Sequence, residues 1–470
     1  MKDNSGKLNL VLVMMCLIAN NLSSAQDSTG KPIKVFILSG QSNMVGAGKV
    51  TGGGGRWGSE FIDPVVSVYD GTYDPQADYD ALQPLNTRKL VKFGGTEPTP
   101  YPGGGTQVTR GFIQVKTTGA YQFRPGYGGS TRNIMEVNGK EVHRQEGNGQ
   151  PIRSEIKLTA GKRVPFKITY LSNDANGLGW IDRMDIPGCL STLVNHQGKY
   201  PYLINDKRQW IARNDVWYKG VIAAAGSNWL GVTTGRIGPE LGFGHIVGEH
   251  HKEPVLVLKA SQGNRSLSWD FLPPGSKRFE HGGKIYAAYK ESPLSWEKGT
   301  DPTPIEWYAG KQYDDCFGAA HDVLDDFDEQ FPHWKGRGFE IKGFAWWQGD
   351  KDRYNEAHAI RYEHNLVHLI KTLRTEFKAP DAKFVIATLG QTAKETAEGN
   401  EKLILEAQLA VDGKTGKYAE FQGNVSTVYT HPLSQGGASN SHYDGNAQTY
   451  MDVGLAMGEA MVKLLKVDNQ

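Results

Sequence analysis

Cysteine is scarce in this sequence, and neither sign of charge dominates it. Only 3 cysteines occur among the 470 residues, and none belongs to a C-x-x-C pair of the kind that binds zinc. Lys and Arg together number 52 and Asp and Glu number 51, so the formal net charge is +1. Nucleic acids and anionic membranes are held by a basic field, which this balance does not provide. A neutral polysaccharide or a small ester therefore fits the composition better as a partner.

Long hydrophobic runs are missing too, apart from one near the N-terminus. Residues 8–19 form an apolar stretch that follows Lys2 and Lys7 and precedes the small residues 23–25. The stretch is too short to span a bilayer, and this order of segments is typical of a secretory signal peptide. We therefore predict a signal peptide at residues 1–25, a secreted or periplasmic mature protein, and no membrane insertion.

Cleavage of that signal would remove Cys16 and leave Cys189 and Cys316. Two cysteines in an exported protein can pair as a disulfide. The alternative is a pair of separate buried thiols, and it is the one we favour.

Apolar runs alternate with helical patterns over much of the chain. Both kinds of segment are short enough to be single elements of a globular domain. Strand-like runs lie at 33–38, 220–224, 254–260, 341–347 and 383–389, and helical patterns lie at 238–249, 315–327, 354–377 and 446–465. Strands that alternate with helices indicate a parallel sheet covered on both faces, which is a three-layer α/β/α architecture.

This alternation stops between residues 93 and 189. The segment has no clear helix but carries strand-like runs separated by glycines, at 111–115, 119–123, 133–137, 154–158 and 164–170. Short strands at regular spacing indicate a β-sandwich. We predict an all-β sandwich at residues 93–189, inserted into an α/β domain made of residues 27–92 and 190–467. Its Gly-Ala-Tyr-Gln-Phe, Val-Asn-Gly-Lys and Leu-Thr-Ala-Gly motifs resemble the PA14-like family of carbohydrate-binding modules.

A serine directly follows the first predicted strand, in the segment Gly40-Gln41-Ser42-Asn43-Met44. At the end of a buried strand and the start of a helix, a serine hydroxyl faces the carboxyl edge of the sheet. Its own backbone N–H would lie at a helix N-terminus, where it can bind an oxyanion. A simple turn or helix cap would use the same residues, so the local pattern alone leaves both interpretations open.

Three further blocks follow in order along the chain. They read Lys259-Ala-Ser-Gln-Gly263-Asn264-Arg265-Ser-Leu267, then Trp346-Trp-Gln348-Gly-Asp350-Lys-Asp352, then Ser439-Asn-Ser-His442-Tyr443-Asp444-Gly445. With the Ser42 segment they resemble the conserved blocks of the SGNH hydrolases, in the branch of sialate O-acetylesterases and family 6 carbohydrate esterases. The resemblance implies a flavodoxin-like SGNH fold with Ser42 as nucleophile and His442 as base. It also implies an oxyanion hole formed by the N–H groups of Ser42 and Gly263 and the side chain of Gln348.

The acid of the triad is less clear, because many relatives carry Asp three residues before the histidine and this chain has Ser439 there. A histidine base needs a partner that orients its ring and stabilises the imidazolium. The resemblance to family 6 esterases that take the acid from the third block implies Asp350 for this role, with Asp352 and then Asp444 as the next candidates. The predicted substrate-binding side chains lie within the blocks, next to the predicted catalytic residues: Gln41, Asn43, Asn264, Arg265 and Tyr443.

The resemblance implies a carboxylic ester hydrolase that removes O-acetyl groups from a polysaccharide or from sialic acid through an acyl-serine intermediate. It implies no metal and no organic cofactor. One alternative is a catalytically weak carbohydrate-binding protein, which the serine at position 439 mildly favours. Another is an esterase or thioesterase of non-carbohydrate substrates, although no apolar lid segment is visible. The glycan, the acetylated position and the oligomeric state stay open.

Overall fold

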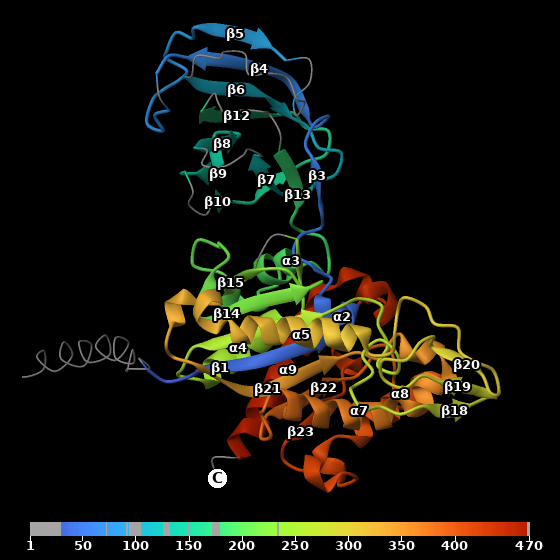
Figure 1. Cartoon of the computed structure of the whole chain (residues 1–470). Coiled ribbons are helices and arrows are strands. Elements are labelled where there is room, and N and C mark those ends of the chain that lie inside the picture. The colour runs from blue at the N-terminus through green and yellow to red at the C-terminus, as the bar shows by residue number, and fades with distance from the viewer. Residues whose placement is uncertain are drawn as a thin grey trace, which may run out of the picture.

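The computed structural model describes residues 30–71, 73–90, 93, 105–125, 132–147, 151–171, 179–232 and 235–467. The predicted signal peptide lies outside these residues. Figure 1 shows an α/β part and, beyond it, a body built of strands. No helix in the described ranges has the length and apolar character needed to cross a membrane.

A seven-stranded sheet forms the centre of the α/β part. In spatial order it contains β15 (Ser227–Gly231), β14 (Ala212–Ile222), β17 (Val255–Ser261), β1 (Ile33–Gly40), β21 (Phe339–Trp347), β22 (Lys383–Ala387) and β23 (Val425–Val428). All neighbouring pairs run parallel except β14 and β15. Every residue of β17 is buried, as expected for a strand with helices on both sides.

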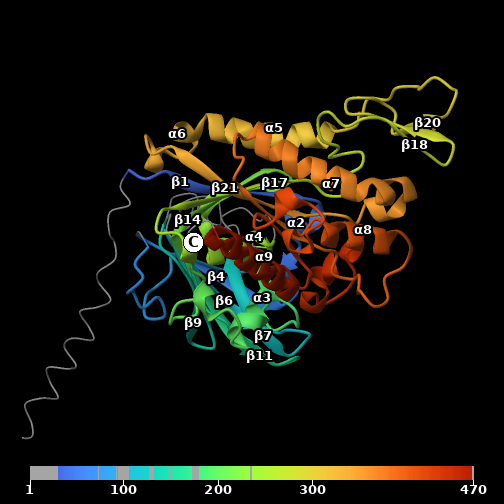
Figure 2. The same ribbon diagram turned by 90° about the horizontal axis from the view of Figure 1, so that it is seen from below.

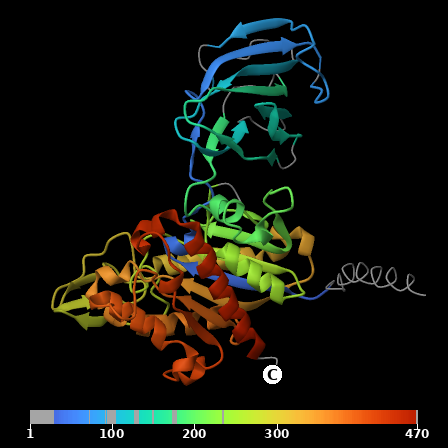
Figure 3. The same cartoon turned by 180° about the vertical axis from the view of Figure 1, so that it is seen from behind.

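Helices cover both faces of this sheet (Figure 2). One face carries α5 (Lys311–Asp325), α7 (Glu356–Glu376) and α8 (Gly399–Ala410), and the short α6 (Phe327–Gln330) follows α5. The other carries α3 (Leu190–Asn195), α4 (Glu240–His250) and α9 (Ala447–Val467). Figure 3 shows α9 in red across the back of the molecule. The predicted three-layer α/β/α architecture is therefore confirmed.

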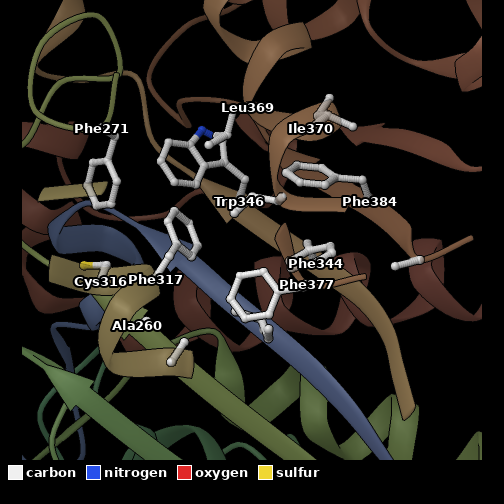
Figure 4. Packing of buried hydrophobic residues seen from close by; sticks show 14 of the residues in the cluster. Ala260, Phe271, Cys316, Phe317, Phe344, Trp346, Leu369, Ile370, Phe377 and Phe384 are labelled. Carbon is white, nitrogen blue, oxygen red and sulfur yellow. The ribbon is translucent and has the colours of Figure 1, made fainter. Parts of the chain in front are cut away.

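The apolar core beneath α5 and α7 is rich in aromatic side chains (Figure 4). Phe271 meets the ring of Trp346 edge-on, with 5.3 Å between centroids, and Phe344 stacks near Phe384 at 5.9 Å. Trp346 and Phe344 project from β21, so the strand that leads to the third sequence block is fixed by close packing. Aromatic pairs of this kind add to the stabilisation from burial alone.

Two sheets make up the strand-rich body. The larger has the order β10 (Ile152–Arg153), β9 (Lys140–Gln145), β8 (Asn133–Val137), β12 (Val164–Leu171), β6 (Thr106–Ile113), β4 (Phe61–Tyr69) and β5 (Asn86–Lys89). The smaller has the order β11 (Ile156–Leu158), β7 (Gly119–Pro125), β13 (Gly179–Arg183) and β3 (Gly54–Arg56). Residues of both sheets share one buried cluster that includes Phe61, Phe123 and Ile168. The body is thus a β-sandwich, as predicted.

The start of this sandwich was predicted at residue 93, and that boundary is wrong. Strands β4 and β5 pair in its larger sheet and β3 pairs in its smaller one, so the sandwich begins near Gly54 and ends near Arg183. A break in the pairing register between Ile62 and Val65 interrupts the alternation of apolar residues in β4. The pattern that marks a half-buried strand is therefore weak in β4, the first long strand of the sandwich, and the start of the sandwich was placed too late.

The two segments that connect the α/β domain to the sandwich lie side by side. The N–H of Gly52 donates to the carbonyl of Arg183 at 2.7 Å, and the N–H of Arg183 donates to the carbonyl of Gly53 at 3.2 Å. The sandwich is therefore a true insertion, since its first and last residues are neighbours.

Cys189 and Cys316 are both free and buried, as favoured from the sequence. Burial raises the pKa of the Cys316 thiol to about 12, so it stays protonated and unreactive. The smaller elements are β2 (Gly48–Lys49) paired with β16 (Arg236–Ile237), and a three-stranded excursion of β18 (Phe279–His281), β19 (Lys284–Tyr286) and β20 (Ser295–Glu297).

Candidate active site

Ser42 lies at the carboxyl end of β1, the strand at which the order of the sheet changes direction. Ligand sites of parallel sheets lie at such switch points. Gly40 ends the strand with a φ of 148°, and a Cβ atom there would come within 2.2 Å of the Trp347 carbonyl oxygen. Helix α2 (Ser42–Val45) begins at once, and the N–H of Ser42 donates to no other described residue. The glycine thus allows the tight turn that presents a half-buried serine with a free N–H.

Gly263 lies directly beside the serine. Its strand, β17, pairs with β1 up to Gly40 and Ser261, and the N–H of Gln262 donates to the carbonyl of Gly40 at 3.2 Å. A Cβ atom on Gly263 would meet the Cβ of Ser42 at 3.4 Å. The N–H of Gly263, like that of Ser42, has no acceptor within the described part of the chain. These two groups are suited to hold an oxyanion.

Lys259 supports the end of helix α2, which begins at Ser42, and was not singled out from the sequence as a functional residue. Its ammonium group is buried in β17 and donates to Glu240 at 2.7 Å and to the carbonyl of Val45, the last residue of α2, at 2.8 Å. A cation at a helix C-terminus satisfies free carbonyl groups and interacts favourably with the helix dipole. A lysine within a buried strand needs an acidic or carbonyl partner for its charge. The position of Lys259 in an otherwise apolar run therefore indicated, from the sequence alone, a residue with a buried ionic contact.

Gln348 does not offer the oxyanion donor that was predicted. Its Nε2 group donates to the carbonyl of Arg265 at 2.9 Å and to Asp352 at 2.6 Å, and its Oε1 atom accepts from Tyr362 at 2.9 Å. Both amide hydrogens are therefore engaged in a fully buried network. The side chain holds the loop after β21 in place, and the backbone N–H groups of Ser42 and Gly263 are the candidate oxyanion donors that stay without an acceptor among the described residues.

Gln41 and Asn43 were predicted to bind substrate, and the structure places both in the interior. The Oε1 atom of Gln41 accepts from the N–H groups of residues 349, 350 and 351, with the shortest bond 3.0 Å. Asn43 donates to the carbonyl of Ser439 at 3.4 Å. Each side chain is at most 2% exposed. They connect the serine turn to the third and fourth blocks and have no surface left for a ligand.

His442 lies in the short helical turn η9 (Ser439–Gly445), just before α9. Its φ of 55° and the φ values of Tyr443 and Asp444 place three successive non-glycine residues in the left-handed region. That conformation costs on the order of 1–2 kcal/mol per residue, and such strain is concentrated at functional sites. The hydroxyl of Tyr450 lies near both Asn43 and the His442 carbonyl, which brings the base loop to the serine turn.

Asp350 does not contact His442, so the predicted bond between them is wrong. Its Oδ1 atom accepts from the hydroxyl of Ser439 at 2.6 Å and from the guanidinium of Arg353 at 2.8 Å. Ser439 holds the position that the acid takes in many relatives. The carboxylate of Asp350 thus supports the loop that carries His442 through the Ser439 hydroxyl. It does not reach the imidazole, because it is hydrogen-bonded to Ser439 and Arg353.

The other two candidate acids do not replace it. Asp352 is completely buried and accepts from the N–H groups of Leu267 and Ser268, and Asp444 is exposed. Within the described residues, the His442 ring forms no hydrogen bond with any acid or with Ser42. Catalytic hydrogen bonds often tighten only when substrate is bound. The structure therefore brings serine and histidine to one edge of the sheet without a triad acid.

Of the remaining predicted binding residues, Tyr443 is buried and packs instead. Its ring stacks on Trp347 with 5.8 Å between centroids, and its hydroxyl accepts from the N–H of Gly390. Asn264 is exposed beside Gly263 with a φ of 55°. Arg265 lies over the ring of Trp307 at 4.6 Å and donates to Gln312 at 3.0 Å. Asn264 and Arg265 are thus the two predicted binding residues next to Gly263 that are not buried.

A family model described as "Carbohydrate esterase, sialic acid-specific acetylesterase" matches residues 194–463, more than half of the chain. No curated protein matches the sequence. The matched range contains the second, third and fourth blocks and all strands of the central sheet except β1.

Several solved structures are similar in part. A protein from Arabidopsis thaliana is 16% identical over 54% of this chain and 87% of its own, with a TM-score of 0.33. A carbohydrate acetylesterase from Xanthomonas citri is 12% identical over 76% of this chain and 70% of its own, with a TM-score of 0.35. The PA14 domain of the antifreeze protein MpAFP is 11% identical over 26% of this chain and 79% of its own, with a TM-score of 0.19. At these values the likenesses carry no argument, and the family match stands by itself.

Proposed function

We propose that this chain, which belongs to the carbohydrate esterase family of sialic acid-specific acetylesterases, removes O-acetyl groups from a carbohydrate through an acyl-serine intermediate. Membership of that family makes the protein a carboxylic ester hydrolase. The intermediate and the roles of single residues are what the proposal adds.

In this mechanism the Ser42 hydroxyl attacks the acetyl carbonyl while His442 takes its proton. The N–H groups of Ser42 and Gly263 hold the oxyanion, and each donor of this kind is worth about 3 kcal/mol of barrier. His442 then protonates the departing sugar oxygen, which leaves an acetyl group on Ser42. Water, deprotonated by the same histidine, then attacks the acetyl-serine. His442 returns that proton to the Ser42 oxygen as the bond to the acetyl group breaks, which releases acetate and restores the free serine.

The observation that carries the proposal is the arrangement of Ser42 and Gly263. A Cβ atom on the glycine would touch the Ser42 Cβ at 3.4 Å, and the N–H groups of both residues lack acceptors among the described residues. A buried polar network would normally consume such donors. Two free donors beside one hydroxyl at a sheet switch point are what acyl transfer requires.

The test is hydrolysis of an aryl acetate and of acetylated polysaccharides by the wild type and by Ser42→Ala. Loss of a triad nucleophile costs on the order of a millionfold in turnover. Ser227→Ala, on the edge strand β15, is the matched control and should keep full activity. Substantial acetate release by folded Ser42→Ala would remove the serine from the mechanism. A wild type that binds acetylated glycan but does not cleave it would favour the alternative of a binding protein.

Two further parts of the proposal concern the export of the protein and the binding of its glycan substrate. We propose that residues 1–25 direct export, on the basis of their charged, apolar and small segments in that order. We also propose that the β-sandwich binds the glycan that carries the acetyl groups, and that Asn264 and Arg265 contact the sugar beside the scissile ester. Release of a mature chain beginning near Gln26, detected by N-terminal sequencing, would test the first part.

A further inference from the structure

We infer that Asp352 is a positioning residue that fixes the backbone N–H of Gly263 in the oxyanion hole. The inference rests on the proposed function for its consequence in catalysis, although the contacts stand without it. Asp352 lies in the 3₁₀ turn η5 (Asp352–Tyr354), after the third sequence block, and Gly263 belongs to the second.

The carboxylate of Asp352 binds three donors in the interior. Its Oδ2 atom accepts from the N–H of Leu267 at 2.8 Å and from the Nε2 group of Gln348 at 2.6 Å. Its Oδ1 atom accepts from the N–H of Ser268 at 2.9 Å. The side chain is 0% exposed, and burial raises the pKa of this carboxyl.

Burial of a carboxylate raises the free energy of the folded state unless donors surround the charge. The hydrogen bonds of Asp352 therefore also hold its donor groups in fixed positions. No cation offsets the charge at bonding distance among the described residues. The nearest basic group is the ring of His358, 4.0 Å away, and burial lowers the pKa of that histidine to about 4. The backbone donors of Leu267 and Ser268 therefore carry the stabilisation.

These donors end the loop that starts at Gly263. The loop leaves β17 after Ser261, passes the oxyanion glycine and is tied at Leu267 and Ser268 to the carboxylate. Gln348 strengthens the tie, because it bonds both Asp352 and the carbonyl of Arg265, two residues beyond the glycine. Loosening this end of the loop would displace the Gly263 N–H, and misplacement by about 1 Å costs on the order of a hundredfold in rate.

The experiment compares Asp352→Asn with Asp412→Asn in the full chain. Asn at 352 would present an NH2 group to donors and leave at least one of them unpaired. Asp412 is a matched control outside the site, because it also accepts backbone N–H groups, those of Lys414 and Thr427, each at 2.8 Å. With an aryl acetate, Asp352→Asn should lower kcat roughly a hundredfold. Its KM and the pH dependence of kcat/KM should stay close to those of the wild type.

Hydrogen exchange measures the same role without catalysis. Peptides that span residues 262–270 should exchange faster in Asp352→Asn than in the wild type or in Asp412→Asn. Asp352→Glu, which keeps the charge, should recover part of kcat and of the protection. Unchanged exchange in this segment, or a folded Asp352→Asn with wild-type kcat, would overturn the inference. An inactive wild type would instead count against the proposed function and leave the exchange result to decide about Asp352.

Discussion

The hydroxyl of Tyr450 lies 3.2 Å from the Oδ1 atom of Asn43 and 3.3 Å from the carbonyl oxygen of His442. One side chain of α9 thus joins Asn43, the residue next to Ser42, to His442. Tyr450 is 0% exposed, so water does not replace these contacts when they are lost. Ser42 and His442 lie near opposite ends of the chain, and this hydroxyl links the side chain next to Ser42 with the backbone of His442.

Tyr450→Phe removes that link and keeps the ring. We expect turnover of an aryl acetate to fall about tenfold, because the left-handed turn at His442 loses a donor that fixes it. The free energy of unfolding should fall by about 1 kcal/mol, as for a typical lost hydrogen bond. Steady-state kinetics and urea unfolding measure the two effects. A normal kcat in a destabilised variant would limit Tyr450 to a role in folding.

Asp350→Asn separates a supporting carboxylate from a triad acid. A triad acid that directly bonds the histidine contributes about ten-thousandfold to turnover. Asp350 bonds Ser439 and Arg353 instead, so we expect a smaller loss of roughly ten- to a hundredfold. Ser439→Ala should give a similar loss, and the double variant should be no worse than either single one. A ten-thousandfold loss would mean that the carboxylate turns to His442 during the reaction.

Removal of the whole sandwich should preserve the esterase. Residues 54–183 can be replaced by a short Gly/Ser bridge because Gly53 and Arg183 are hydrogen-bonded neighbours. We expect aryl-acetate hydrolysis to stay near the wild-type rate and action on acetylated polymer to weaken. The matched comparison is deletion of residues 94–188, which leaves β4 and β5 without β6 and exposes an unpaired strand edge. The variant that lacks residues 94–188 should aggregate. If deletion of residues 54–183 lowers activity equally on the aryl acetate and on the polymer, the sandwich is part of the active site.

His245 should make stability depend on pH. The ring is buried in α4 against Tyr202, and burial, with a smaller effect of Arg213, lowers its pKa from 6.5 to about 4. Between pH 6.5 and 4 the unfolded chain binds a proton that the folded protein does not, so the free energy of unfolding falls as the pH falls. At pH 5 this histidine accounts for a loss of about 2 kcal/mol.

His245→Phe should remove that part of the pH dependence. Urea unfolding at pH 7 and pH 5 would show a smaller difference for the variant than for the wild type. If both proteins lose the same stability, the histidine is already protonated in the fold.

The elements were predictable from the sequence where burial is complete. Strand β17 was predicted at 254–260 and spans Val255–Ser261, and β21 was predicted at 341–347 and spans Phe339–Trp347. A parallel strand covered on both faces reads as an unbroken apolar run, so its limits are visible locally. Strand β4, with Pro64 and a register break, gives no such run, so the first strands of the sandwich were assigned to the α/β domain.

The partners of polar side chains were harder to predict. The sequence blocks located Ser42, Gly263 and His442 at one edge of the sheet, but the roles of Asp350, Gln348 and Tyr443 depended on residues far away in the chain. Asp350 finds Ser439, 89 positions later, and Tyr443 finds Gly390, 53 positions earlier. Which hydrogen-bond partner a polar side chain finds is decided by the packing of distant segments, and no local sequence pattern encodes that packing.

The central place of β1 in the sheet also affects how the chain folds during its synthesis. Both flanking strands of β1 are encoded more than two hundred residues after it, since Lys34 pairs with Val255 and with Glu340. Contacts so distant in sequence form slowly, and domains assemble from the N-terminus as the ribosome proceeds. The strand that precedes Ser42 is thus synthesised long before either of the two strands that pair with it. A nascent chain that stops before Val255 would hold Ser42 after an unpaired, apolar strand, exposed to aggregation and incapable of catalysis.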